Sequence, residues 1–265
     1  MGEIKMNQIM NKERKKVTSR GKKNHLLGFV QGFILFNVLW WIFALGIQSK
    51  ALPSPFEVYP LLPKMLKEGM LHHVGVSLKR LGLGLFWATL IGASLGYVMG
   101  KMRWVNKILS PLVYFTYPIP KTALLPILMI LGGLGDTSKM ILIVLITVFP
   151  LMIAVRDSLL QVDPGLEHVL ISLGASPLQK MWHVTLPAIF PQIMTQLRLS
   201  VGTSLSVLFF AENYGTQLGL GYYVQDYWAR MNYPYMYGGI LMLALLGCGL
   251  FILLDLLENT LIGGK

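Results

Sequence analysis

The residues that could catalyse a reaction or hold a metal are few, and their spacing suits neither role. His72 and His73 are adjacent, so they cannot project from one face of a helix. The single cysteine, Cys248, excludes a disulfide within the chain and a multi-cysteine metal site. The glycine-rich turn at 132–135 lacks the Gly-Lys-Ser/Thr that completes a phosphate-binding loop. The sequence therefore predicts no catalytic residue, no metal site and no nucleotide site in this chain.

Three charged residues lie in otherwise apolar stretches, where their chemistry would be to handle a charged solute. Lys121 and Arg198 are isolated cations, and Glu212 is an isolated acid. Ionisable groups at membrane depth often mark the route of a solute, and cations suit an anionic one. A structural role is equally open, in which each cation reaches the interface or pairs with a carbonyl group or with Glu212. The three residues are candidates for lining a translocation path.

A polar segment at 163–191 interrupts the apolar stretches and carries clear helix punctuation. Asp163 precedes a proline, which is typical of an N-cap followed by the first helical residue. Gly174 is suited to the left-handed residue that ends a helix, and Ser176 before another proline repeats the start signal. The pattern predicts a helix over 163–173, a sharp turn, and a short second helix to about residue 183.

The second short helix would show Met181 and Trp182, residue types that are enriched at protein interfaces. The segment would therefore be held by a partner outside the membrane. The alternative is that it packs against the inner surface of its own chain. If a partner does hold it, the helix would act as a lever, because an apolar span begins directly after it at Leu186-Pro187.

The elements that position these residues are membrane helices. The chain has 265 residues, of which 54% are hydrophobic and 13% charged, against about 25% charged in soluble domains. The apolar residues form blocks long enough to cross a bilayer. We expect an all-α membrane protein with one six-helix domain over 26–260. Its spans would be Leu26–Ile47, Leu81–Gly100, Lys107–Gly135, Met140–Val155 (short, ending near Pro150), Pro187–Ala211 and Tyr235–Leu254.

The charge distribution predicts the orientation. The net charge is +11, and a basic tail at 1–25 directly precedes the first apolar block. Positive residues beside a span mark the cytoplasmic side, an explanation we favour over nucleic-acid binding. Six crossings then place both termini and the loop at 156–186 in the cytoplasm. Lys79 and Arg80 fall at an outer helix end and are exceptions to this rule.

The polar segment resembles the EAA loop of binding-protein-dependent ABC importer permeases. The resemblance rests on Gly174 within Leu-Gly-Ala-Ser-Pro and on the Leu186-Pro187 pair at matching spacing. The chain departs from the family at the Glu-Ala-Ala positions, which are His168-Val169-Leu170, with Glu167 one residue early. Further motifs resemble the branch that imports nitrate, taurine, aliphatic sulfonates and related small anions or heterocycles. They are LPSP at 52–55, SLKRLGLG at 77–84, YPIPKTALLPIL at 117–128, GLGDTSK at 133–139 and AENYGTQLGLGY at 211–222.

The resemblance implies a type I importer permease fold with a cytoplasmic coupling loop. Two copies, or two homologous permeases, would form the path in the cell membrane, with two cytoplasmic ABC ATPases and an external solute-binding protein as partners. ATP and Mg would be bound by the ATPase, and no cofactor by this chain. The residues that would contact the ATPase are Glu167, Gly174, Ala175, Ser176, Pro177, Leu178, Met181 and Trp182.

Two further points stay open at this stage. Glu212 and Asp226 would either anchor the binding protein or cap helices. The alternative function is a stand-alone proton-coupled carrier or a membrane-embedded enzyme. Such a protein needs paired intramembrane acids or bases, and Asp255 and Glu258 are the other candidates.

Overall fold

A computed structural model describes residues 30–262, except for the side chains of Pro164, Glu167, His168, Leu261 and Ile262. The basic tail at 1–25 lies outside the described residues. The chain forms two compact units, one ending at Leu61 and the other beginning at Leu62. The described residues are helical apart from short connecting turns.

The first unit is a helix, Val30–Ile47, followed by a compact turn that contains α2 (Pro55–Val58) and the 3-10 turn η1 (Tyr59–Leu61). Trp40 donates from Nε1 to the carbonyl oxygen of Pro53 at 2.9 Å. The Tyr59 hydroxyl donates to Asn37 Oδ1 at 2.5 Å. These two hydrogen bonds hold the turn against the helix that precedes it.

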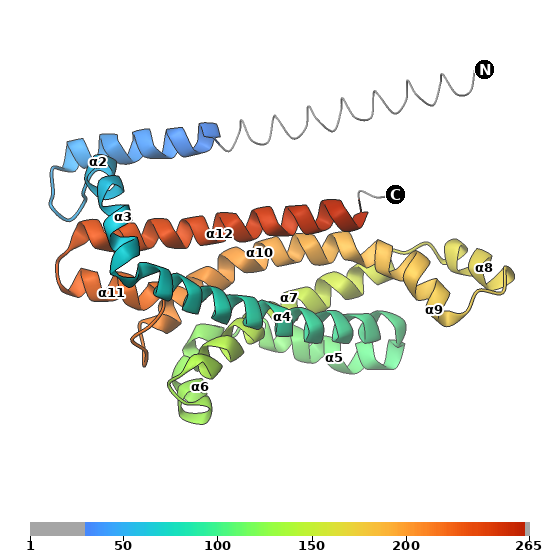
Figure 1. Cartoon of the computed structure of the whole chain (residues 1–265). Helices are drawn as coiled ribbons and strands as arrows, with labels where there is room; N and C mark the ends of the chain where they lie inside the picture. Colours follow the sequence, from blue (N-terminus) through green and yellow to red (C-terminus); the bar gives the residue numbers. More distant parts are fainter. Residues whose placement is uncertain (1–29, 263–265) are drawn as a thin grey trace, which may run out of the picture. The chain divides into compact units, whose positions relative to one another are not determined.

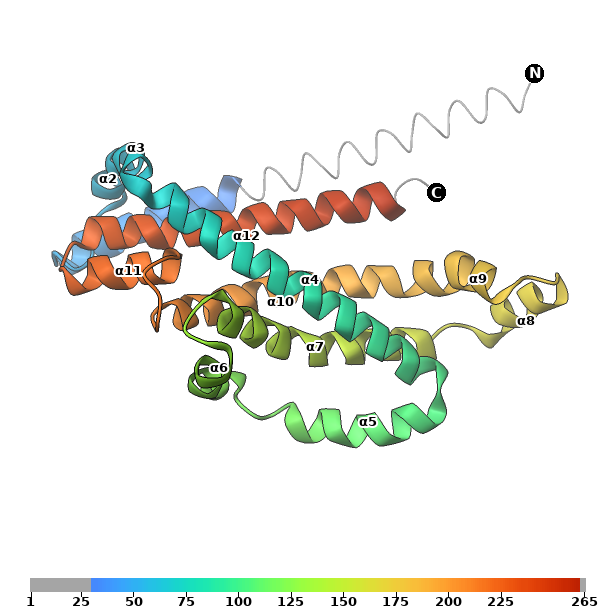
Figure 2. The ribbon, with the colours of Figure 1, turned by 60° about the horizontal axis from the view of Figure 1, so that its bottom comes forward.

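Figure 1 shows the second unit, in which α4, α7 and α10 pack against one another. Figure 2 shows α8 and α9 at one end of these helices, and α6 and α11 toward the other end. The elements are α3 (Leu62–Met65), η2 (Leu66–Met70), α4 (Leu71–Lys101), α5 (Arg103–Thr116), η3 (Lys121–Leu124), α6 (Leu125–Gly132), α7 (Asp136–Leu160), α8 (Pro164–Ser172), α9 (Pro177–Lys180), η4 (Met181–Thr185), α10 (Leu186–Glu212), α11 (Leu220–Ala229) and α12 (Tyr233–Ile262).

The contact between α4 and α7 depends on glycines along one side of α4. A Cβ placed on Gly96 would lie 2.6 Å from the Met152 carbonyl oxygen, whereas one on Gly82 would meet nothing within 4 Å. Helices in a membrane associate through such close backbone approach, because apolar surface gains little from leaving lipid. The two helices are thereby fixed as a tightly packed pair.

Within 30–262, five helices are long and apolar enough to cross a membrane, and a sixth crossing results if one bent pair counts as a span. The expected short span ending near Pro150 is wrong in its length, since α7 runs unbroken through that proline to Leu160. A proline removes one backbone hydrogen bond, and neighbouring helices can compensate for that loss in a membrane.

The expected span over 107–135 is not one straight helix. It consists of α5 and of a second segment, Lys121–Gly132, bent from α5 by 86°. Pro118 and Pro120 lie at the bend and have no N–H group to continue the helical hydrogen bonds. The residues between the two helices, 117–120, are exposed and form a break in this expected span.

Candidate functional site

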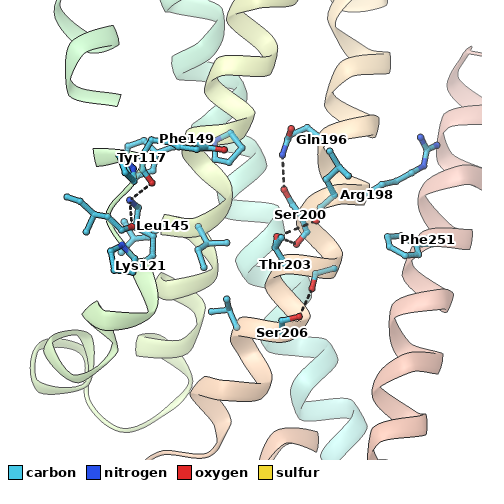
Figure 3. Close-up of a pocket in the computed structure, with 18 residues that line it drawn as sticks. Tyr117, Lys121, Leu145, Phe149, Gln196, Arg198, Ser200, Thr203, Ser206 and Phe251 are labelled. Carbon is cyan, nitrogen blue, oxygen red and sulfur yellow. Dashed lines mark hydrogen bonds between the residues drawn. The ribbon is translucent and has the colours of Figure 1, made fainter. Parts of the chain in front are cut away.

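A cavity of about 1040 Å³ lies between α7, α10 and the break at 117–120 (Figure 3). One wall is a polar stripe on α10, and the others are largely apolar. The stripe consists of Gln196, Ser200, Thr203 and Ser206. Residues three and four apart lie on one face of a helix, so this otherwise apolar span presents hydroxyl and amide groups to the cavity. The arrangement suits a small polar solute.

Lys121 lines this cavity at the break. Its ammonium group donates to the carbonyl oxygen of Thr116 and, at 2.9 Å, to that of Ile119. In an unbroken helix the Thr116 carbonyl would accept from residue 120, which is a proline, so Lys121 replaces the missing donor. The ring of Phe149 lies 5.3 Å from the ammonium nitrogen. Lys121 therefore pairs with carbonyl groups, as one sequence-based alternative proposed, and none of the acids whose side chains are described within residues 30–262 pairs with it.

Arg198 also lines the cavity, but its charge is engaged elsewhere. Its Nε donates to Asp255 Oδ1 at 2.8 Å, and its Nη2 pairs with Glu258 on the same helix, α12. Figure 3 shows Arg198 directed away from Lys121 and toward α12. The partner of Arg198 is therefore not Glu212. The two acids that a proton-coupled carrier would need are both paired with this one cation.

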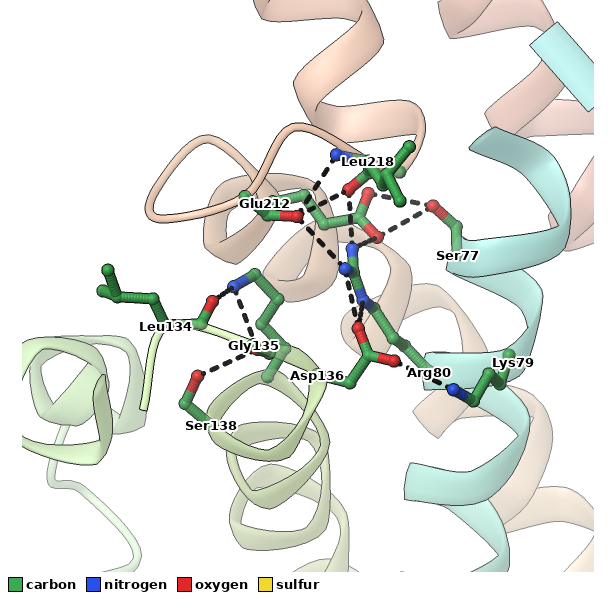
Figure 4. Close-up of polar contacts among 12 residues, drawn as sticks. Ser77, Lys79, Arg80, Leu134, Gly135, Asp136, Ser138, Glu212 and Leu218 are labelled. Carbon is green, nitrogen blue, oxygen red and sulfur yellow. Dashed lines mark hydrogen bonds and ion pairs between the residues drawn. The ribbon is translucent and has the colours of Figure 1, made fainter. Parts of the chain in front are cut away.

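Glu212 does not line the cavity but lies fully buried in a separate polar cluster (Figure 4). Its carboxylate accepts hydrogen bonds from the Ser77 hydroxyl at 2.8 Å and from Arg80 Nη1 at 2.8 Å. It also accepts from the backbone N–H of Gly221 at 2.8 Å. This geometry fits a structural anchor between α4, α10 and α11.

Arg80 is the centre of this cluster. It pairs with Asp136 at 2.8 Å as well as with Glu212, and its Nη1 also donates to the Leu218 carbonyl at 2.8 Å. Lys79 reaches Asp136 at 3.0 Å from the exposed side. We call Ser77, Lys79, Arg80, Asp136, Lys139 and Glu212 the Arg80 cluster.

Lys139 is the second buried cation of the Arg80 cluster. The side chain is fully buried and donates to the carbonyl oxygens of Leu134 at 2.9 Å and Gly135 at 3.2 Å. Sequence reasoning missed the cluster as a site, although two signals pointed to it. Lys79 and Arg80 were exceptions to the charge rule, and the motifs at 77–84, 133–139 and 211–222 meet here.

The polar loop after α7 has the predicted punctuation. Asp163 Oδ1 accepts from the Gly165 N–H at 2.8 Å and caps α8. Gly174 has a φ of +72°, and the Ala175 N–H donates to the Leu170 carbonyl at 2.9 Å, which closes the end of the helix. Ser176 caps α9 in a box with Gln179, whose Oε1 accepts from the Ser176 N–H at 2.8 Å. The predicted first helix, the turn at Gly174 and the start of the second helix are confirmed.

The second short helix differs from its prediction, because it does not end near residue 183. From Pro177 the helix continues through the π turn η4 into α10 and ends at Glu212. No helix-ending residue separates the parts, and Pro187 is accommodated directly after the π turn, in the first turn of α10. The loop therefore begins a membrane helix directly instead of being joined to it by a second turn.

Apolar side chains of this loop are exposed in the single chain. Trp182 and Leu178 are each 61% exposed, and Leu173 is 76% exposed. Met181 and Ala175 are half-buried, while the side chain of Glu167 lies outside the described residues. The loop does not bury these apolar side chains against the part of the chain that the structure describes, which disfavours the alternative that it packs only on its own chain.

At the other end, α11 carries a row of aromatic residues. Tyr223 packs on Tyr227 with ring centroids 4.6 Å apart, and burial raises the pKa of the Tyr223 phenol. Asp226 pairs with Arg230 one turn further along the same helix. Asp226 therefore supports α11 itself, although this does not test whether it also contacts a partner.

Comparison with known proteins places these features in context. Residues 88–262 match the family described as "Binding-protein-dependent transport system inner membrane component". The chain is 33% identical over 235 residues to the taurine transport system permease protein TauC of Escherichia coli, covering 86% of each chain. It is 28% identical to the formylaminopyrimidine transport permease protein ThiX of Halalkalibacterium halodurans, covering 87% of this chain and 92% of that one. A structure of the MetNI methionine ABC transporter in inward-facing conformations matches with a TM-score of 0.60 and 17% identity, over 75% of this chain and 97% of that chain.

Proposed function

Because the chain belongs to the family of binding-protein-dependent transport system inner membrane components and is a permease subunit of an ABC importer, we propose that two copies of it form the path of a small anionic solute. The subunit itself is not an enzyme, since a separate ATPase subunit hydrolyses ATP in this family. An external solute-binding protein delivers the solute.

The break at 117–120 carries the proposal that a second copy completes the path. Irregular backbone exposed to lipid is not tolerated in the hydrocarbon region, because its polar groups would have no hydrogen-bond partners. Tyr117, Pro118, Ile119 and Pro120 are all exposed in the single chain. This segment must therefore face protein or a water-filled space. A symmetric pair of chains would supply both, with the cavity next to the two-fold axis.

The charge of Lys121 supports an anionic solute. The ammonium group is bonded to neutral carbonyl groups and to no carboxylate among the described residues, whereas the charge of Arg198 is balanced by Asp255 and Glu258. Relatives bear the names of taurine, aliphatic sulfonates and bicarbonate. A small heterocycle is the alternative, as in the name of the formylaminopyrimidine permease.

The solute can be tested by uptake into proteoliposomes that contain the chain with its ATPase and binding protein. We expect ATP-dependent uptake of radiolabelled taurine, a sulfonate or bicarbonate. Lys121→Gln removes the charge but keeps N–H donors for the carbonyls, and it should reduce anion uptake about tenfold, equivalent to 1.4 kcal/mol. Lys121→Arg retains the charge and serves as the control. Equal anion uptake by wild type and Lys121→Gln would show that Lys121 does not handle the solute, and uptake of the pyrimidine with no uptake of any anion would favour the heterocycle.

The loop with α8 and α9 is the proposed contact with the ATPase. Its exposed apolar residues, Leu173, Leu178 and Trp182, give a surface for the partner. Because α9 runs on into α10, whose residues line the cavity, movement of the loop is passed to the cavity without an intervening hinge. ATP-driven motion of the partner would thus shift the path between inward-open and outward-open states.

This role requires the loop and both chain termini to be cytoplasmic. Single cysteines at position 60 or 178, in a Cys248→Ala background, can be labelled on intact cells with a membrane-impermeant maleimide. We expect labelling at 60 and protection at 178 until the membrane is opened. Labelling at 178 from outside would invert the orientation and exclude an ATPase at this loop.

A further inference from the structure

The Arg80 cluster joins three parts of the chain that are distant in sequence. Arg80 and Ser77 come from α4, Asp136 from the start of α7, and Glu212 from the end of α10. Figure 4 shows their side chains converging. The Leu220 N–H donates to the Ser77 hydroxyl at 2.8 Å, so the start of α11 is held by the same group.

The Arg80–Glu212 pair at the centre of the cluster is buried, so water cannot replace either partner. The side chain of Arg80 is 3% exposed and that of Glu212 is 0% exposed. Removing one partner from such a pair is strongly destabilising, because it leaves an uncompensated buried charge. A transport step that separated these elements would have to break several of these contacts at once. The cluster therefore opposes relative movement of the helix ends that it joins.

Beside the cluster, glycines occupy two backbone positions that have no room for a side chain. Gly219 has a φ of +114°, and a Cβ there would overlap the carboxylate of Glu212. A Cβ on Gly221 would fall on the Phe209 carbonyl oxygen and 2.8 Å from the Glu212 Cβ. The turn at 213–219 is thus packed directly on the Arg80–Glu212 ion pair.

The break at 117–120 has the opposite character. Its residues are exposed in the single chain, its two prolines cannot donate helical hydrogen bonds, and the carbonyls of Tyr117 and Ile119 accept from the flexible side chain of Lys121. Hinges are a few residues between elements that absorb changes in backbone angle, and movable elements are those with few buried contacts. Within one copy the break makes few buried contacts and meets this description, and it borders the cavity.

We propose that the Arg80 cluster locks the adjoining ends of α4, α7, α10 and α11 into one body, and that the transport motion occurs at the break at 117–120. This proposal rests on the proposed function, since it concerns how the path opens. The tight packing of α4 on α7 extends the same body along the bundle. Opening and closing would then move the break across the cavity relative to α10.

Distances between spin labels test the proposal in the assembled transporter. In a Cys248→Ala background, one labelled pair at 78 and 218 reports on the locked body, and another at 119 and 199 spans the cavity. Leu78, Leu218, Ile119 and Leu199 are all exposed enough to carry a label. Complexes with one labelled and one unlabelled copy, separated by two affinity tags, remove signals between copies.

Measurements without nucleotide and after trapping with ATP and vanadate should separate the two pairs. We expect the 78–218 distance to change by less than about 2 Å and the 119–199 distance by about 5 Å or more, which is the scale of one helical turn in switching transitions. An equal shift in both pairs would overturn the locked body, and an unchanged 119–199 distance would overturn the hinge. If neither ATP binding nor hydrolysis occurs in the complex, the proposed function itself fails.

A variant that neutralises Glu212 shows whether electrostatic pairing holds the helix ends together. Glu212→Gln should broaden the 78–218 distance distribution, whereas Lys79→Gln, at the exposed edge of the cluster, should not. If Glu212→Gln does not assemble, Asp136→Asn tests the same point, because Asp136 is partly exposed and Arg80 keeps Glu212. A distribution as narrow as that of the wild type in an assembled variant would refute an electrostatic lock.

Discussion

Arg80→Met is expected to destabilise the folded chain by about 3–5 kcal/mol, because it leaves a buried Glu212 without its cation. Glu212 is fully buried, and its other partners, Ser77 and Gly221, are neutral hydrogen-bond donors. Methionine fills much of the arginine volume, so the loss comes from the charge and not from a cavity. The change in Tm is measured by heating the purified chain in detergent and determining the fraction of protein that remains monodisperse at each temperature.

Two variants make the reason for this loss testable. Lys79→Met also removes a cation that pairs with Asp136, but Lys79 is 60% exposed, so we expect less than about 1 kcal/mol. Adding Glu212→Gln and Asp136→Asn to Arg80→Met should restore part of the stability, since the buried charges are then neutral. A Tm of Arg80→Met equal to that of Lys79→Met would show that burial does not strengthen this pair.

Gly174→Val is expected to weaken retention of the ATPase about tenfold, which corresponds to 1.4 kcal/mol. Gly174 has a φ of +72°, and a left-handed conformation costs a residue with a Cβ about 1–2 kcal/mol, more if it is β-branched. A Cβ there would meet nothing within 4 Å, so strain in the backbone is the cause and not a clash. The fraction of ATPase that co-purifies with a tagged permease measures the effect.

Gly174→Asn is the matched control, because asparagine tolerates the left-handed conformation far better than valine. It should retain most of the ATPase while adding a larger side chain at the same place. Similar losses in both variants would point to a steric conflict with the partner. Full retention in Gly174→Val would remove the turn from the proposed coupling.

The local structure of the polar loop was predictable because its signals are short in range. A cap needs only a side chain that reaches an N–H two or three residues away, as Asp163 and Ser176 do. The left-handed turn at Gly174 is likewise a property of one residue. The sequence did not predict that α9 runs on into α10, because a proline such as Pro187 is typical of the first turn of a new helix.

The candidate path residues could be found from the sequence but not assigned a partner. Lys121, Arg198 and Glu212 stand out as charges in apolar stretches, and that signal is independent of the fold. Their partners lie between 2 residues away, as with Lys121 and Ile119, and 135 residues away, as with Glu212 and Ser77. The structure places Lys121 and Arg198 at one cavity and Glu212 at another site.

By itself the sequence determined that this is a helical membrane protein with a capped polar loop, because hydrophobic length and helix capping are local properties. It also determined the resemblance to importer permeases, which the motifs carry as strings of residues. Only the tertiary structure decided that Arg80, Asp136 and Glu212 meet and that Arg198 is neutralised by α12. Charge pairing depends on which helix ends are neighbours, and in this chain the packing of α4, α7 and α10 sets that.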